Sequence, residues 1–133
     1  MAIKVKHLKP EFTDFRGVIT RIVNEPKVNI KAVLLLTHKK NTIRGNHYHK
    51  KDSHWVYCVS GKFRYYEKDL KKKNAKASSV ILKPGDLIYS KPGIAHAMEA
   101  IVDTVFLAIT TEKRQQKNYE NDLVRIDIVG KKK

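Results

Sequence analysis

Short apolar segments recur along the 133-residue chain, separated by clusters of Gly, Pro, Asn, Asp and Lys. The segments are rich in Val, Ile, Tyr and Phe, which favour extended backbone. They predict strands at Val18–Val23, Val28–Thr37, His54–Ser60, Lys62–Tyr66, Ser79–Leu82, Leu87–Ser90, His96–Ile101, Thr104–Thr110 and, last, Leu123–Val129. The polar stretch from Glu112 to Glu120 is expected to form a loop or one helical turn. This pattern indicates an all-β sandwich or small barrel, with a ligand-binding mouth at one end.

Alternation within the strand His54–Ser60 assigns its side chains to two faces. If His54 points inward, Val56 and Cys58 share its face and Cys58 is a small core residue. Trp55 and Tyr57 then lie on the other face. They pack either against a second copy of the chain, which favours a homodimer, or beneath a loop of the same chain.

Four of the six histidines fall in two short stretches of the sequence. His47 and His49 are two residues apart in an extended segment, so they point the same way, roughly 7 Å apart. With His54 and the distant His96 they could converge on one small volume. Neutral imidazoles bind zinc, iron, nickel or manganese, so these four residues are candidate metal ligands. The remaining two histidines, His7 and His38, are expected at the surface.

The same histidines could instead carry acid–base chemistry, because imidazole titrates near neutral pH. The candidate base is His47, with His49 as the alternative. Arg44 could bind a phosphate with its planar, bidentate guanidinium. Strict alternation would place Arg44 on the opposite face from His47, so it reaches the same pocket only if Gly45 bends or bulges the strand.

Composition narrows the classes of function. The net charge of +15 would attract a phosphorylated small molecule, but it is spread along the chain and no nucleic-acid-binding motif is present. We therefore expect neither a nucleic-acid partner nor a membrane partner. The single cysteine, Cys58, and the lack of an apolar leader or membrane-spanning run favour a cytoplasmic protein with one domain over residues 1–133.

Two motifs resemble those of the cupin superfamily. The first, His-x-His followed at a fixed spacing by Glu and Gly, is similar to His47-x-His49, His54 and Gly61, with His54 at the usual Glu position. The second is similar to the stretch from Gly85 to His96, with Lys91 at the usual Pro position. The resemblance implies a single-domain cupin double-stranded β-helix, a jelly-roll β-barrel with the histidines directed into its mouth.

A closer resemblance concerns the segment Arg44-Gly45-Asn46-His47-Tyr48-His49, which is similar to the signature of sugar-nucleotide 3,4-ketoisomerases and keto-sugar epimerase-like small cupins. It implies an isomerase or epimerase that acts on a nucleotide-linked 4-keto-6-deoxy sugar, as in polysaccharide biosynthesis. In the related rhamnose epimerases a tyrosine is the acid partner, and its candidates here are Tyr89 and Tyr119. Two alternatives stay open: a non-catalytic metal-binding cupin for a small carbohydrate or anion, and an iron-dependent cupin dioxygenase.

Overall fold

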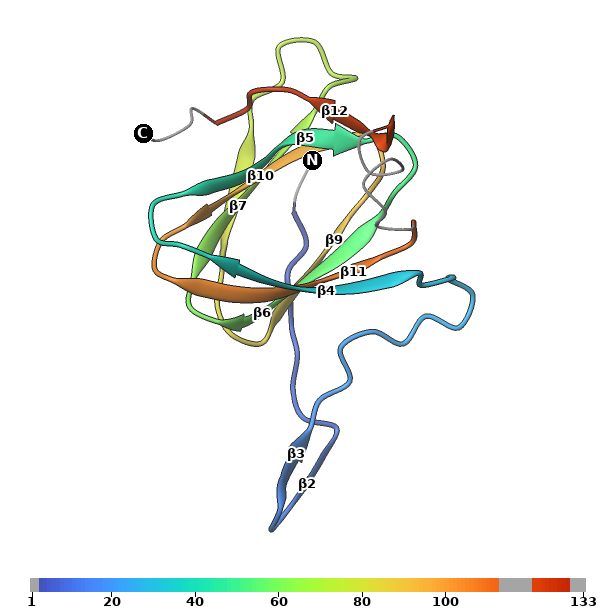
Figure 1. Cartoon of the computed structure of the whole chain (residues 1–133), viewed down its shortest axis with the longest axis vertical. Coiled ribbons are helices and arrows are strands. Elements are labelled where there is room, and N and C mark those ends of the chain that lie inside the picture. Colours follow the sequence, from blue (N-terminus) through green and yellow to red (C-terminus); the bar gives the residue numbers. More distant parts are fainter. Residues whose placement is uncertain (1–2, 113–120, 130–133) are drawn as a thin grey trace.

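The computed structural model of the chain describes residues 3–112 and 121–129. Two five-stranded antiparallel sheets face each other and form a barrel (Figure 1). One sheet has the order β1 (Lys6–His7), β9 (Asp86–Ser90), β6 (His54–Ser60), β11 (Thr104–Thr110), β4 (Ala32–His38). The other has the order β12 (Leu123–Arg125), β5 (Ile43–His49), β10 (Ile94–Ala100), β7 (Phe63–Asp69), β8 (Ser78–Leu82). The predicted all-β jelly-roll fold is confirmed.

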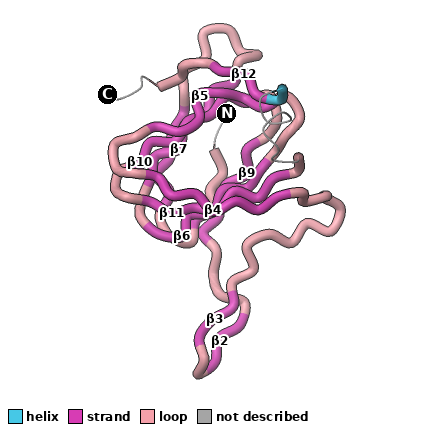
Figure 2. Tube along the Cα trace, viewed as in Figure 1, coloured by secondary structure: helices cyan, strands magenta, loops and turns pink. Residues whose placement is uncertain are grey.

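A small hairpin, β2 (Phe12–Asp14) and β3 (Gly17–Ile19), projects from the barrel (Figures 1 and 2). Sequence analysis did not predict β1 or β2, which contain only two and three residues. In the described part of the chain, no helix is long and apolar enough to cross a membrane.

The core lies between the two sheets. It contains eight buried side chains: Val56, Cys58, Phe63, Tyr65, Leu82, Ile88, Met98 and Phe106. The alternation expected for β6 holds, because Val56 and Cys58 point inward on the same face as His54. Burial raises the pKa of the Cys58 thiol to about 11, which keeps it protonated and fits its predicted role as a core residue.

The predicted strand boundaries are correct for His54–Ser60 and Thr104–Thr110. Three other strands, predicted at Val18–Val23, Val28–Thr37 and Leu123–Val129, are shorter than expected. Residues 20–31 are not part of any strand, although the sequence predicted strands over much of this range. Their apolar side chains Ile22, Val23 and Val28 pack against a second cluster formed by Trp55, Leu87 and Ile109. The apolar pattern in this segment therefore reflects a loop that covers a sheet. Of the loop or helical turn predicted at Glu112–Glu120, residues 113–120 lie outside the described residues.

This packing decides between the two interpretations of Trp55 and Tyr57. Trp55 is buried and Tyr57 half-buried beneath segments of the same chain, so they do not offer an exposed face to a second copy. Among the described residues, the most exposed large apolar side chains lie elsewhere, with Phe15 97% exposed at the tip of the β2–β3 hairpin and Leu35 69% exposed on β4. The homodimer stays a prediction.

The structure corrects the expected position of one histidine outside the motifs. His7 is exposed and pairs with Asp86, with 2.7 Å between Nδ1 and Oδ1, but His38 is buried at the end of β4. Its Nε2 lies 2.9 Å from the carbonyl oxygen of Thr42, and its ring meets Phe106 edge-on. The turn that follows β4 folds back over the imidazole, which the strand pattern alone could not indicate.

Burial of His38 predicts a loss of stability at mildly acidic pH. Removal from water lowers the pKa of His38 below its ordinary value of 6.5, and the Arg44 charge lowers it further against the opposing Thr42 hydrogen bond. His38 in the unfolded chain therefore binds a proton more tightly than His38 in the folded chain. Neutral, buried His38 contributes its full share to the stability of the fold above pH 6.5, and this contribution is lost as pH falls. The urea-unfolding free energy should fall between about pH 7.5 and 5.5, less steeply in His38→Gln. Equal slopes for the two proteins would contradict this account.

Candidate functional site

Four histidine side chains converge in the interior of the barrel. His47 and His49 come from β5, His54 from β6 in the facing sheet and His96 from β10. All four are buried and line a cavity of about 120 Å³ between the sheets. The ring centroids of His47 and His96 are 4.7 Å apart, and those of His49 and His54 are 5.3 Å apart. His47 and His96 are far apart in sequence, but they meet because β5 pairs with β10 and places these two residues opposite each other.

A β-bulge in β5 shapes the entrance to this cavity. The register between β5 and β10 shifts by one residue, so that His96 pairs with His47 and Ala97 pairs with Gly45. Gly45 and Asn46 both have positive φ, 88° and 57°. The extra residue reverses the alternation and brings Arg44 to the same cavity as His47. Arg44 therefore reaches the pocket by the route that the sequence required, and one of its terminal nitrogens donates to the Thr37 carbonyl at 3.0 Å.

The buried side chain of Asn46 anchors the bulge to the end of the described chain. Its amide nitrogen donates to the Val129 carbonyl at 2.9 Å, and its oxygen accepts from the backbone N–H groups of Ile128 and Val129 at 3.2 and 3.1 Å. These three hydrogen bonds hold Asn46 in its unusual conformation. The segment after β12 thus helps to position the residues on either side of the bulge.

Three of the histidines have a polar group beside Nδ1. His49 Nδ1 lies 3.2 Å from Asp122 Oδ2 and His96 Nδ1 lies 3.3 Å from Ser90 Oγ, both within hydrogen-bond distance. His54 Nδ1 lies 4.0 Å from Asp52 Oδ2, which is close enough for an ion pair but too far for a hydrogen bond. A group that occupies Nδ1 orients the ring and leaves Nε2 for the opposite side. In this arrangement Nε2 stays available on the cavity side, where it could ligate a metal ion or accept a proton.

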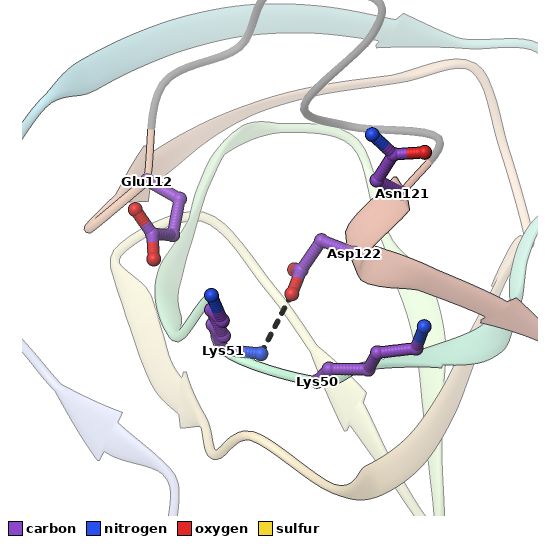
Figure 3. Close-up of a pocket in the computed structure, with 5 residues that line it drawn as sticks. All are labelled: Lys50, Lys51, Glu112, Asn121 and Asp122. Atoms are coloured by element: carbon purple, nitrogen blue, oxygen red, sulfur yellow. Dashed lines mark hydrogen bonds between the residues drawn. The ribbon is translucent and has the colours of Figure 1, made fainter.

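The carboxylate of Asp122 is itself firmly held. The backbone N–H of Lys51 donates to Oδ1 at 2.7 Å (Figure 3). The backbone N–H of Asp52 donates to Oδ2 at 3.2 Å. Asp122 directly precedes β12, which pairs with β5 so that Leu123 lies opposite His49. Strand pairing therefore places this carboxylate beside His49 although 73 residues separate the two in sequence.

The electrostatic environment keeps at least one of the four rings neutral. Burial lowers the pKa of His96 well below its ordinary value, and the neighbouring rings of His47 and His49 lower it further, against the opposing effect of a hydrogen bond with the Ile94 backbone. A neutral imidazole retains a lone pair, which both metal ligation and proton abstraction require. Two groups of donors within 4.8 Å of one another could hold a metal ion: His47, His49 and His96, and His49, Asp52 and His54.

Sequence reasoning missed several residues that contact the histidines. These are Asp122 beside His49, Asp52 beside His54, and the buried Tyr65, whose ring stacks on His96 with 6.2 Å between centroids. Of the two tyrosines that were considered, Tyr89 is exposed and packs on Trp55 at 4.9 Å on the outer face, away from the histidines. Tyr119 lies outside the described residues. The position of Tyr65, two residues after Phe63 on the inner face of an alternating strand, was the available signal.

A larger cavity of about 330 Å³ lies beside the site, lined by Lys50, Lys51, Glu112, Asn121 and Asp122 (Figure 3). None of the four histidines is among its described lining residues, and Asp122 connects it to them through His49. The chemistry of the cluster therefore belongs to the smaller cavity in the barrel.

Comparison with solved structures finds similar barrels. QdtA, a sugar 3,4-ketoisomerase from Thermoanaerobacterium thermosaccharolyticum in complex with TDP, is 23% identical with a TM-score of 0.73, covering 92% of this chain and 87% of that chain. A 3,4-ketoisomerase from Helicobacter canadensis is 19% identical with a TM-score of 0.75, covering 94% and 91%. A dTDP-4-dehydrorhamnose 3,5-epimerase from Sulfolobus tokodaii is 17% identical with a TM-score of 0.68, covering 85% and 80%.

A search of curated protein sequences finds no significant match. By contrast, the sequence model of the cupin domain matches residues 34–110, more than half of the chain, and this range includes all four clustered histidines. The barrel, the two histidine motifs and this match agree. The chain therefore belongs to the cupin family.

Proposed function

We propose that this cupin is an isomerase or epimerase that moves a proton next to the ketone of a nucleotide-linked 4-keto-6-deoxy sugar. The observation that carries the proposal is the pair formed by His49 and Asp122, with 3.2 Å between Nδ1 and Oδ2. His49 is buried at the wall of the histidine cavity, and Asp122 is half-buried and lines the neighbouring larger cavity. A carboxylate at Nδ1 fixes the proton there, leaves the Nε2 lone pair to accept a proton and stabilises the imidazolium that results. Such a pair is suited to general-base catalysis.

The proposed reaction needs only a base and a source of protons. His49 Nε2 takes the proton from the carbon beside the ketone, and the electrons of the broken C–H bond form an enediolate. Return of a proton to the former carbonyl carbon, together with transfer of the hydroxyl proton from the neighbouring oxygen to the former ketone oxygen, moves the ketone. Return of the proton to the opposite face of the first carbon inverts the configuration of that carbon. His47, the base first suggested by the sequence, is the alternative and lines the same cavity.

The size of the cavity limits how a substrate can bind. A volume of about 120 Å³ admits a small group such as part of a sugar ring, but not a nucleotide. Arg44 lines this cavity and is exposed to solvent, so its guanidinium is available to a pyrophosphate that remains outside. A similar barrel supports this assignment, since QdtA was solved in complex with TDP and, as a mutant, in complex with TDP-4-keto-6-deoxyglucose.

Product analysis tests the proposal. The protein would be incubated with TDP- and UDP-linked 4-keto-6-deoxy sugars, and NMR would identify any new keto sugar. The proposal predicts at least one isomerised or epimerised product. A folded protein that binds these sugars without converting any of them would instead support the binding module.

Truncation of Arg44 should weaken nucleotide binding. Loss of a charge-assisted hydrogen bond costs about 1.5–3 kcal/mol, so Arg44→Ala should raise the Kd for TDP roughly 10- to 100-fold. Isothermal titration calorimetry at fixed salt would measure the change. Arg64→Ala is the matched control, because Arg64 lies on β7 and contacts Ser79 outside the cavity. Equal affinities for wild type and Arg44→Ala would remove Arg44 from the binding site.

A second candidate function is a metal-dependent cupin, favoured by the four converging imidazoles. His47, His49, His54 and His96 would hold the ion, which as a Lewis acid stabilises negative charge on substrate oxygens. A histidine can be a base only while its Nε2 is uncoordinated, so the two roles compete. This candidate includes the non-catalytic binder of a carbohydrate or anion and the iron-dependent dioxygenase, which oxygen uptake with a diketone or thiol substrate would reveal.

Measurement of the metal content distinguishes the metal-dependent candidate from the metal-free isomerase or epimerase. If the cluster binds zinc, iron, nickel or manganese, protein purified without a histidine tag should contain close to one ion per chain, and His96→Asn should lose most of it. Elemental analysis measures both, and His7→Asn is the control because His7 lies outside the cluster. Less than about 0.1 ion per chain in the wild-type protein would reject the metal-dependent candidate.

A further inference from the structure

A buried chain of hydrogen bonds connects His96 to a carboxylate that no step above uses. Tyr65 Oη lies 2.8 Å from Glu67 Oε2 and 3.2 Å from Ser90 Oγ, and Ser90 Oγ lies 3.3 Å from His96 Nδ1. All four residues are buried. Tyr65 and Glu67 alternate onto the inner face of β7, and strand pairing places Glu67 directly opposite His96. The chain therefore runs from Glu67 to one nitrogen of a site histidine.

The chemistry of the groups gives this chain a direction. A phenol has one proton, so Tyr65 can donate to only one of its two partners. An ionised carboxylate can only accept, and the hydrogen bond of Tyr65 with Glu67 is the shorter of its two. Burial raises the pKa of Glu67, whereas the Tyr65 hydrogen bond and the Lys91 charge lower it. With Glu67 ionised, Tyr65 therefore donates to Glu67 and accepts from the hydroxyl of Ser90. The Ser90 oxygen is then left to accept a proton from His96.

We propose that Tyr65 and Glu67 are positioning residues that act through Ser90 to hold His96 as the Nδ1–H tautomer, with the Nε2 lone pair facing the cavity. The other tautomer would place an N–H among the four rings, where it could neither ligate an ion nor accept a proton. His96 therefore presents the same atom whether the site binds a metal or moves a proton. The inference rests on the proposed role of His96 at the site, but the tautomer exists without substrate or metal.

Long-range ¹H–¹⁵N NMR of metal-free, ¹⁵N-labelled protein tests the proposal, because it reports which ring nitrogen carries the proton. The His96 signals are assigned by their loss in His96→Asn. Wild-type His96 should be the Nδ1–H tautomer. In Tyr65→Phe the Ser90 hydroxyl loses its acceptor and can donate to Nδ1, so a substantial Nε2–H population should appear. The same change at Tyr66, which contacts Glu99 on the outer face of β7, should leave the tautomer unchanged.

A second variant keeps the proposal testable if Tyr65→Phe does not fold. Glu67→Gln preserves the shape of the side chain, but its amide can donate as well as accept, so it no longer imposes a direction on the chain. It should also produce a mixture of tautomers. A wild-type His96 in the Nε2–H form, or an unchanged tautomer in every folded variant, would overturn the proposal. Failure to convert any keto sugar would refute the proposed function and leave this result standing.

Discussion

Replacement of His49 by alanine should reduce the rate of deuterium transfer from solvent into a keto-sugar substrate by about 10²- to 10⁴-fold, the usual contribution of a general base. The reason is that His49 lines the cavity and has a carboxylate, Asp122, within hydrogen-bond distance of its Nδ1. Asp122→Asn should also reduce this exchange rate, because an amide can donate to Nδ1 of His49 and favour the tautomer with the proton on Nε2. NMR measurement of the exchange rate in D₂O would compare the variants.

The control for this prediction is a second histidine–aspartate pair in the same chain. His7 contacts Asp86 at 2.7 Å on the exposed surface, so His7→Ala removes an imidazole of the same kind away from the cavity and should leave exchange unchanged. If His49→Ala keeps more than about a tenth of the wild-type rate while His47→Ala loses activity, the base is His47, as the sequence first suggested.

Replacement of Gly45 by alanine should disrupt both the fold and the site. At the Gly45 φ of +88° a Cβ would lie 2.9 Å from the His96 carbonyl oxygen and 3.0 Å from the Ala97 Cα, both backbone atoms of the paired strand. Backbone strain of about 1–3 kcal/mol and this clash act together, so the free energy of unfolding should fall by more than about 2 kcal/mol. Displacement of Arg44 and His47 should also weaken TDP binding. Urea unfolding and calorimetry measure the two effects.

Gly93→Ala separates the effect of backbone strain at positive φ from the effect of the clash between a Cβ and the paired strand. Gly93 has a similar φ of +79°, but a Cβ there would meet nothing within 4 Å. This variant should lose only the conformational part, about 1–2 kcal/mol, and should retain its affinity for TDP. Equal losses of stability and affinity in the two variants would show that close approach of β5 and β10 is not what requires glycine at position 45.

Much of the barrel could be predicted because its signals are local. Alternation placed His54, Val56 and Cys58 on one face, and turn residues bounded β6 and β11 correctly. The strands predicted over residues 20–31 were wrong, because a loop that packs over Trp55 needs the same apolar side chains as a strand. A residue pattern reports that a side chain is covered, but not which element covers it.

The site was predictable only in part, for a similar reason. Spacing of two residues brought His47 and His49 to one face, and the two motifs indicated His54 and His96. The bulge that turns Arg44 inward depends on the register between β5 and β10, which no local pattern specifies. Asp122 depends on the pairing of β12 with β5, and Tyr65 on the approach of β7 to β10. These contacts join residues far apart in sequence, so the groups that orient the histidines could be identified only in the structure.

The most direct test of the central claim is solvent deuterium exchange at the carbons beside the ketone. Wild-type protein, folded and with its metal content established, would be incubated in D₂O with TDP- and UDP-linked 4-keto-6-deoxy sugars, and NMR would follow the C3 and C5 protons. Proton abstraction by an imidazole in the barrel predicts enzyme-dependent loss of the C3 or C5 signal in at least one sugar. No exchange at either carbon in any of them would contradict it.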